Sequence, residues 1–121
     1  GTTVNALSNY DSGLETATCT GLSQPGGDVA YSVVLAASTA YTFTLTGVDP
    51  NLDPSISLVG PGAAAVCDVD PVNCLAGADA GALGENETLH VTTTAAGTYY
   101  VIVDSFDTAT SGTFTVKVTS P

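Results

Sequence analysis

Carboxylate side chains are the groups in this sequence whose type and spacing are best suited to form a site. The chain has 12 acidic residues, and many of its Asp residues fall in Gly- and Pro-containing segments between apolar stretches. Calcium takes about six to eight oxygen ligands, often from Asp, Asn and backbone carbonyls in such loops. Two groups of residues fit this pattern. The first is Asn9, Asp11 and Asp28, and the second is Asp53, Asp79 and Asp104, with Glu85 or Glu87 nearby.

The charge balance gives these carboxylates a reason to bind a cation. Lys117 is the single basic residue, and the formal net charge is −11. At most one carboxylate can therefore have a Lys or Arg partner within the chain, and clustered carboxylates without a cation repel one another. Calcium is the cofactor that this imbalance favours. The alternative is that the carboxylates only cap turns and keep the surface soluble.

The same imbalance argues against two classes of partner. Nucleic-acid binding needs a basic surface that displaces counterions, and the chain has one Lys and no Arg. Anionic membranes are disfavoured for the same reason. Membrane insertion is not predicted either, because no apolar run approaches the length of a bilayer span.

Three cysteines point to an oxidising compartment. Cys67 and Cys74 flank a turn-rich segment, and we expect them to form a local disulfide. Cys19 is then left as a buried thiol or a link to another chain. A zinc site is a poor rival, because only Cys19 and His90 remain to complete it.

No residue pattern indicates catalysis. His90 is the only histidine, and it falls on the polar face of an alternating strand, where a surface position is expected. A Ser–His–Asp arrangement is formally possible, but nothing resembles a nucleophile elbow. The aromatic residues occupy alternating apolar faces, so packing in the core is a better interpretation than a binding strip.

The elements that must position these side chains read as short strands. The run 95–104 is apolar on both faces, which predicts a doubly buried strand with Tyr100 and Ile102 in the core. The stretch 112–118 alternates, and we expect it to form a hairpin with the preceding strand. Further strands are predicted at 2–7, 14–20, 28–35, 40–47, 55–59 and 87–93, with a glycine-rich loop at 77–85. About eight to nine short strands without helical periodicity indicate an all-β antiparallel sandwich or jelly roll.

The length of 121 residues fits a single domain, 1–121. Residues 1–13 are a possible extension or an exchangeable N-terminal strand. The chain begins at Gly1 and contains no Met, which we interpret as a processed or excised product of an exported protein.

Several motifs, in order from about residue 28 to residue 118, resemble the bacterial pre-peptidase C-terminal domain family. Asp28-Val29-Ala30-Tyr31-Ser32-Val33 is similar to its "D-x-x-Y-x-hydrophobic" strand. Leu52-Asp53-Pro54-Ser55-Ile56-Ser57-Leu58 is similar to its "D-x-x-L-x-L" strand. Gly77-Ala78-Asp79-Ala80-Gly81 resembles its acidic loop. The "A-G-T-Y-Y-h-h-V-D" signature is similar to residues 96–104, and the closing "G-x-F/Y-x-hydrophobic" motif to residues 112–116.

The resemblance implies a jelly-roll-like β-sandwich that accompanies secreted enzymes and carries no catalysis itself. In the related collagen-binding modules of bacterial collagenases, calcium ties an N-terminal segment to the carboxylate that opens the "D-x-x-Y" strand. Here that implies Asp28, with Asn9 and Asp11 as N-terminal contributors. Two features depart from the family: the Glu-rich linker is absent, and Asp79 stands where many members have two consecutive acidic residues.

Two functions follow as expectations. The first is a non-catalytic structural or adhesive module, secreted or at the cell surface, whose partners are copies of itself or an extracellular protein or polymer. Residues 2–7 would pair with a neighbour's open sheet edge, or else with the chain's own sheet. The second is an accessory domain that targets or stabilises a secreted peptidase.

Overall fold

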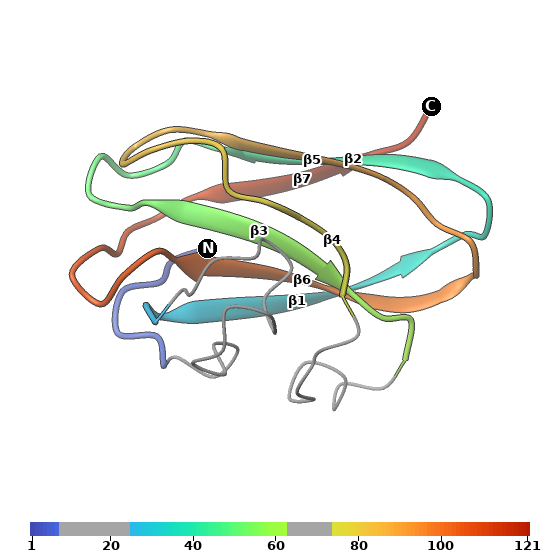
Figure 1. Ribbon diagram of the computed structural model, residues 1–121, viewed down its shortest axis with the longest axis horizontal. Coiled ribbons are helices and arrows are strands. Elements are labelled where there is room, and N and C mark those ends of the chain that lie inside the picture. The colour runs from blue at the N-terminus through green and yellow to red at the C-terminus, as the bar shows by residue number, and fades with distance from the viewer. Residues whose placement is uncertain (8–24, 63–73) are drawn as a thin grey trace.

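The computed structural model of the protein describes residues 1–7, 25–62 and 74–121. This part of the chain forms seven β-strands and no helix (Figure 1). The strands are β1 (Asp28–Leu35), β2 (Ala40–Thr46), β3 (Pro54–Val59), β4 (Cys74–Ala78), β5 (Glu87–Thr92), β6 (Gly97–Ser105) and β7 (Thr115–Thr119). The predicted all-β class is confirmed. The strand expected at 14–20 lies outside the described residues.

The strands form two antiparallel sheets that pack face to face (Figure 1). One sheet has four strands in the order β1-β6-β3-β4, and the other has three in the order β5-β2-β7. Of the consecutive strands in the described ranges, β3 and β4 alone share a sheet. All other steps from one strand to the next cross between the sheets, as they commonly do in jelly-roll sandwiches.

The predicted C-terminal hairpin is wrong. Strand β6 lies between β1 and β3 in the four-stranded sheet, whereas β7 pairs with β2 in the other sheet. Residues 106–114 carry the chain across, and the Phe106 N–H donates to the Asp53 carbonyl at 2.9 Å on the way. Because β1 and β3 occupy both edges of β6, no edge remains there for β7 to join.

The core between the sheets follows the apolar alternation of the sequence. Phe43 and Leu45 of β2, and Ile56 and Leu58 of β3, are fully buried. The remaining buried members of this core are Leu35, Leu52, Leu89, Tyr99, Val101, Val103 and Phe114. Each of the strands predicted from alternation therefore turns its apolar face inward.

Strand β6 is buried on both faces over most of its length, as its apolar run predicts. Tyr99, Val101 and Val103 belong to the core between the sheets. On the opposite face, Ile102 is only 1% exposed. Tyr100, which was also expected in the core, is half-buried instead. Its partner in β3 is Val59, the last residue of that strand, so the sheet gives less cover at this point.

Two elements differ from the sequence-based expectation. Residues 74–78, expected to lead into a loop, form β4, which pairs with β3 and has a register shift at Leu58 and Val59. Ala76 and Ala78 of β4 pack against the core, but alanines next to Gly77 give only a weak alternating pattern, so the sequence did not indicate a strand here. At the N-terminus, the predicted strand 2–7 is reduced to one bridge between Thr2 and Thr113, followed by a turn in which Asn5 has a positive φ of 59°.

Candidate functional site

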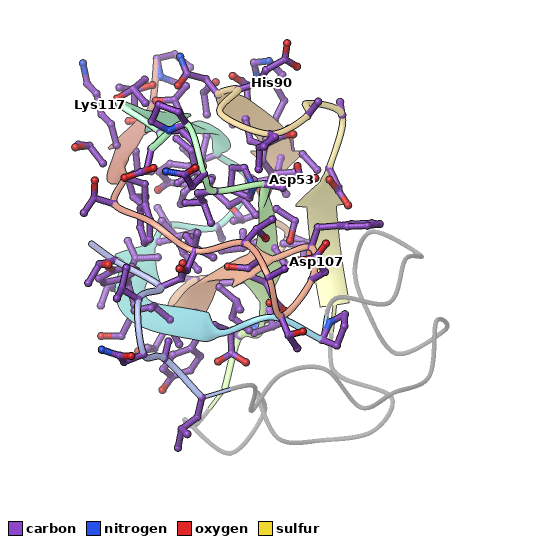
Figure 2. All side chains as sticks on the ribbon, turned by 90° about the vertical axis from the view of Figure 1, so that its left-hand side faces the viewer. Asp53, His90, Asp107 and Lys117 are labelled. Carbon is purple, nitrogen blue, oxygen red and sulfur yellow. The ribbon has the colours of Figure 1, made fainter. Side chains whose placement is uncertain are left out.

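One end of the sandwich gathers carboxylates from loops and strand ends. The start of β3 lies beside the end of β4 and beside the end of β6, because both neighbours run antiparallel to β3. The loops that join these strands therefore meet at this end, which faces the viewer in Figure 2. We call the following residues the acidic end: Asp53, Asp79, Glu85, Glu87 and Asp107.

Glu87 is the most deeply buried carboxylate of the acidic end, with 2% of its surface exposed. Its Oε1 accepts hydrogen bonds from the Ala80 N–H at 2.9 Å and from the Gly81 N–H. Burial raises the pKa of Glu87, the two backbone hydrogen bonds lower it, and the charges of Asp79 and Asp53 raise it further. The net effect is a raised pKa, so the folded state favours the protonated form of this group.

Asp53 is the second group of the acidic end with a perturbed ionisation. Burial raises its pKa, and the charges of Asp79, Asp107 and Glu85 add to this effect in that order. Its Oδ1 atom is buried and has no hydrogen-bond partner within the described residues. A carboxylate oxygen in that position is stabilised by a proton or by a cation.

The second predicted group of ligands is assembled in part. The structure brings Asp53 and Asp79 into electrostatic contact with each other, and both Glu85 and Glu87 join them. It also adds Asp107, which the sequence analysis did not include. Asp107 follows β6 closely, as Asp79 follows β4, so its place after a strand end was a signal that could have identified it.

The third predicted member, Asp104, is the next-to-last residue of β6 and so lies near the same end of the sheet. It is 1% exposed and occupies β6, where Ser55 of β3 and Asp28 of β1 are its two partners in the register. The pairing of Asp28 with Asp104 places two carboxylates directly opposite each other across neighbouring strands. Asn9 and Asp11, the other members of the first predicted group, lie outside the described residues.

Neither group forms a complete metal site from the described residues. Within residues 1–7, 25–62 and 74–121, no three His, Cys, Asp or Glu side chains are grouped so that they could hold a metal ion. Calcium binding therefore stays a prediction. Of the first group, Asp28 is the one member that lies within the described residues.

The predicted disulfide also stays a prediction. Cys19 and Cys67 lie outside the described residues, and of Cys74 only the backbone is described, as the first residue of β4.

His90 occupies the exposed face of β5, as its place in the alternating pattern predicts. Its Nδ1 lies 3.1 Å from the Oγ1 of Thr42, its cross-strand partner in β2, which is a hydrogen-bond distance. Figure 2 shows His90 and the exposed Lys117 away from Asp53 and Asp107. The hydrogen bond to Thr42 gives His90 a structural partner on the surface of its own sheet.

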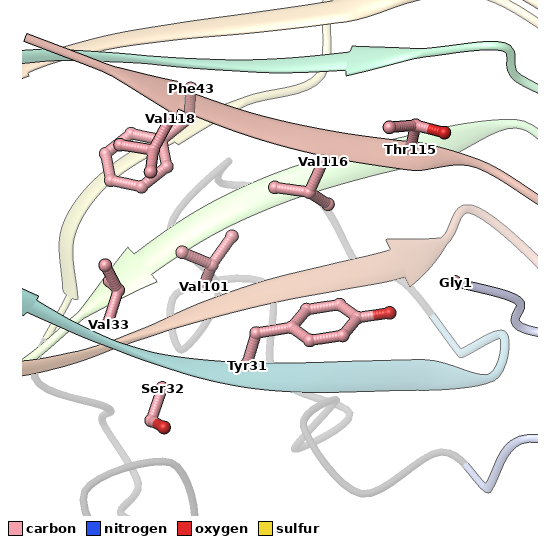
Figure 3. Close-up of a pocket in the computed structure, with 9 residues that line it drawn as sticks. All are labelled: Gly1, Tyr31, Ser32, Val33, Phe43, Val101, Thr115, Val116 and Val118. Carbon is pink, nitrogen blue, oxygen red and sulfur yellow. The ribbon is translucent and has the colours of Figure 1, made fainter.

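An apolar groove opens along one side of the sandwich, between β1 and β7 (Figure 3). These two strands are the edges of their sheets on this side. The groove has a volume of about 360 Å³. It is lined by Gly1, Tyr31, Ser32, Val33, Phe43, Val101, Thr115, Val116 and Val118. Among the described residues that line it, the polar groups are the Gly1 amino group and the hydroxyls of Tyr31, Ser32 and Thr115, and the remaining lining is apolar and suits an apolar side chain.

The N-terminus lies at one end of this groove and pairs there with residues 112–114 through an isolated bridge. The Gly1 amino group donates to the Phe114 carbonyl at 2.8 Å, and the Phe114 N–H donates back to the Gly1 carbonyl at 3.0 Å. The Thr3 N–H donates to the Gly112 carbonyl at 2.9 Å. A Cβ atom at Gly1 would overlap the Tyr31 hydroxyl and the Phe114 ring, so this position fits glycine alone without rearrangement.

Membrane-spanning helices are not part of the described fold: none of its segments is a helix with the length and apolar character of a bilayer span.

Comparison with known proteins shows a similarity in fold to a solved structure. No family model and no curated protein matches the chain. Among solved structures, the chain is similar to PliG of Aeromonas hydrophila, a periplasmic lysozyme inhibitor of g-type lysozyme. The match covers 81% of this chain and 79% of that chain, with a TM-score of 0.59 and 15% sequence identity. At this identity the similarity concerns the β-sandwich architecture.

Proposed function

We propose that this protein is a non-catalytic, extracellular structural or adhesive module that associates with copies of itself by β-strand addition. The observation that carries the proposal is the apolar groove between two edge strands, β1 and β7. An open edge supplies unpaired backbone donors and acceptors, and the groove beside it supplies a place for alternate side chains. Together these are the requirements for accepting a further strand.

The N-terminal segment supports this function because it already behaves as an added strand. Gly1 and Thr3 pair antiparallel with Phe114 and Gly112, directly ahead of β7. Within the single chain, the pairing with the chain's own sheet is therefore the one observed. The same hydrogen bonds can form between two copies if the segment is exchanged, which is a common route to oligomers.

Calcium stabilisation belongs to the same proposal. The net charge of −11 opposes any association of copies, and the acidic end concentrates part of that charge around the half-buried Asp53 and the buried Glu87. A divalent cation would reduce both the repulsion within one copy and the repulsion between copies.

Electron microscopy and sedimentation of the purified native chain test this function directly. We expect filaments or discrete oligomers. Val118→Lys should weaken the association, because Val118 lines the groove and is 41% exposed. Thr119→Lys is the matched control, because the neighbouring residue in the strand points to the other face. A chain that stays monomeric at every concentration would refute self-assembly.

A second candidate is an accessory domain that targets or stabilises a secreted peptidase. Its support is the similarity in fold to PliG, a lysozyme inhibitor and so a protein that acts on an enzyme. The purified chain would then bind a secreted peptidase or an insoluble protein polymer such as collagen, and would remain monomeric alone. Co-sedimentation with the polymer, with and without the peptidase, separates this function from self-assembly.

A further inference from the structure

The edge of β1 is unusual for a chain of this charge. Of its eight residues only Asp28, the first, is charged, and Val29 to Leu35 carry no charge at all. Val34 is 80% exposed and Tyr31 is 37% exposed. Soluble proteins usually protect a long edge strand with Lys, Pro or a bulge, because an open edge can pair with another chain. None of these features interrupts β1, and its register with β6 is continuous from Asp28 to Leu35.

Hydrogen bonds at the start of β1 show which of its backbone groups point away from β6. The Ser105 N–H of β6 donates to the Gly27 carbonyl, whereas the Asp28 N–H donates to the Leu7 carbonyl at 3.0 Å. Because backbone direction alternates along a strand, the outward groups belong to Asp28 and to every second residue after it. The N-terminal segment takes the group on Asp28. Among residues 1–7, 25–62 and 74–121, no strand pairs with the outward groups of Ala30, Ser32 and Val34, and Ser32 is the midpoint of the three.

We propose that two copies of the chain pair through β1, antiparallel and about a two-fold axis at Ser32. Ser32 would then oppose Ser32 of the second copy, and Ala30 would oppose Val34. The result is a continuous eight-stranded sheet, with the order β4-β3-β6-β1 repeated in reverse beyond the axis. The contact is isologous, so it closes at a dimer. The inference rests on the proposed self-association and specifies the strand that mediates it.

The side chains of β1 are complementary to themselves in this register. On the inward face, Tyr31 opposes Val33 of the second copy. A cross-strand pair of an aromatic and a β-branched side chain is favourable. Asp28 lies beyond the paired segment, so no carboxylates are brought face to face. The inward residues of the second copy also extend the apolar surface beside the groove, next to Val116 and Val118.

The other edge strand beside the groove, β7, is a poorer choice for a second copy. Lys117 is the central residue of the five-residue strand β7. An antiparallel pairing of β7 with itself about its midpoint would place Lys117 directly opposite Lys117 of the second copy. Like charges in directly opposed positions destabilise a strand pair. Of the two edge strands beside the groove, the distribution of charge therefore favours β1 over β7.

Sedimentation equilibrium and amide hydrogen exchange by NMR test the pairing. We expect a monomer–dimer equilibrium over about a hundredfold range of protein concentration. As the dimer population rises with protein concentration, the amides of Ala30, Ser32 and Val34 should become protected from hydrogen exchange, while those of β7 should not. Ser32→Lys should weaken the dimer by about tenfold or more, because it opposes two like charges on the axis. Thr88→Lys, on the exposed face of β5, is the matched control and should leave the dimer unchanged.

Ser32→Pro provides a second variant should the lysine variant fail to fold. It removes an N–H that points away from β6, so the pairing of β1 with β6 keeps its hydrogen bonds. A dimer that keeps its affinity in both folded variants, or that protects the amides of β7, overturns the β1 pairing while leaving self-assembly intact. A chain that stays monomeric at every concentration overturns both the β1 pairing and self-assembly. If β1 binds a foreign extended peptide but no second copy of the chain, the proposed occupant of this edge is wrong.

Discussion

Replacing Ile102 with Ala should cost the protein a large part of its stability. Ile102 is 1% exposed, and it lies on the face of β6 that points away from the core between the sheets. Its register partners are Ala30 in β1 and Ser57 in β3, which have short side chains. They cannot fill the space that the three deleted carbons leave, so the cavity should persist. Large-to-small changes of this kind cost about 2–5 kcal/mol, and a persistent cavity places this one at about 3–5 kcal/mol.

This loss can be converted into a melting temperature. Globular proteins gain about 2.1 cal/mol/K of unfolding entropy per residue near 60 °C, which for 121 residues is about 0.25 kcal/mol/K. The variant should therefore melt about 12–20 °C below the wild type. A domain of this size has a total stability of about 6–18 kcal/mol, so Ile102→Ala would remain folded at low temperature in all but the lower part of that range.

Circular dichroism melts of three variants make the measurement specific. Ile102→Val should lie between the wild type and Ile102→Ala, because it removes one carbon and costs about 0.5–1.5 kcal/mol. Leu7→Ala is the matched control, since it deletes the same number of carbons from a side chain that is 72% exposed. If Ile102→Ala melts with the control, the outer face of β6 is not a packed layer and the reasoning is refuted.

Three further predictions concern ionisation, metal and disulfide. Glu87→Gln should raise the melting temperature at neutral pH, because burial makes ionisation of Glu87 more costly in the folded state than in the unfolded state. The raised pKa means that stability falls as pH rises through the folded pKa, and the variant removes this loss. Melts between about pH 4 and pH 8 should also show a flatter profile for this variant, and an unchanged profile would contradict the assignment. Calcium at about 100 times its dissociation constant should add about 2.7 kcal/mol to the free energy of unfolding. EGTA should reverse this gain, and Asp28→Asn should reduce it. If protein stripped of metal melts at the same temperature with and without calcium, the carboxylates serve only to keep the surface soluble. Non-reducing peptide mapping should recover Cys67 linked to Cys74, and a peptide linking Cys19 to either of them would contradict that pairing.

The strands were predictable from the sequence where side chains alternate. Residues 28–35 and 40–46 form strands at nearly the predicted bounds, and Phe43 is in the core as its position required. The sheet partners were not predictable in the same way. Alternation reports which face of a strand is buried, but it carries no information on which strand lies at each edge. The hairpin prediction failed for this reason, since β6 took its partners from strands that lie far back in the sequence.

The acidic end was predictable in part for a related reason. Asp53 and Asp79 adjoin the ends of strands that neighbour each other, so proximity in the fold followed from their places beside β3 and β4. Asp107 lies in the connection 106–114, whose path depends on the crossing between sheets that the hairpin prediction had excluded. Asp104 was expected at a strand end and is the next-to-last residue of β6, where its register partners are Ser55 and Asp28.

The central position of β6 has a consequence for how the protein folds. Strand β1 has β6 as its only sheet partner in the described fold, and β3 needs β6 to fill its second edge. Both partner strands precede β6 by about 40 residues or more in the sequence. Asp104 of β6, for example, pairs with Asp28 of β1 and with Ser55 of β3. Contacts this distant in sequence close late and slow the folding reaction. A nascent chain that has not yet released Gly97 to Ser105 therefore lacks the strand that joins β1 to β3, and the four-stranded sheet can close only after that segment is free.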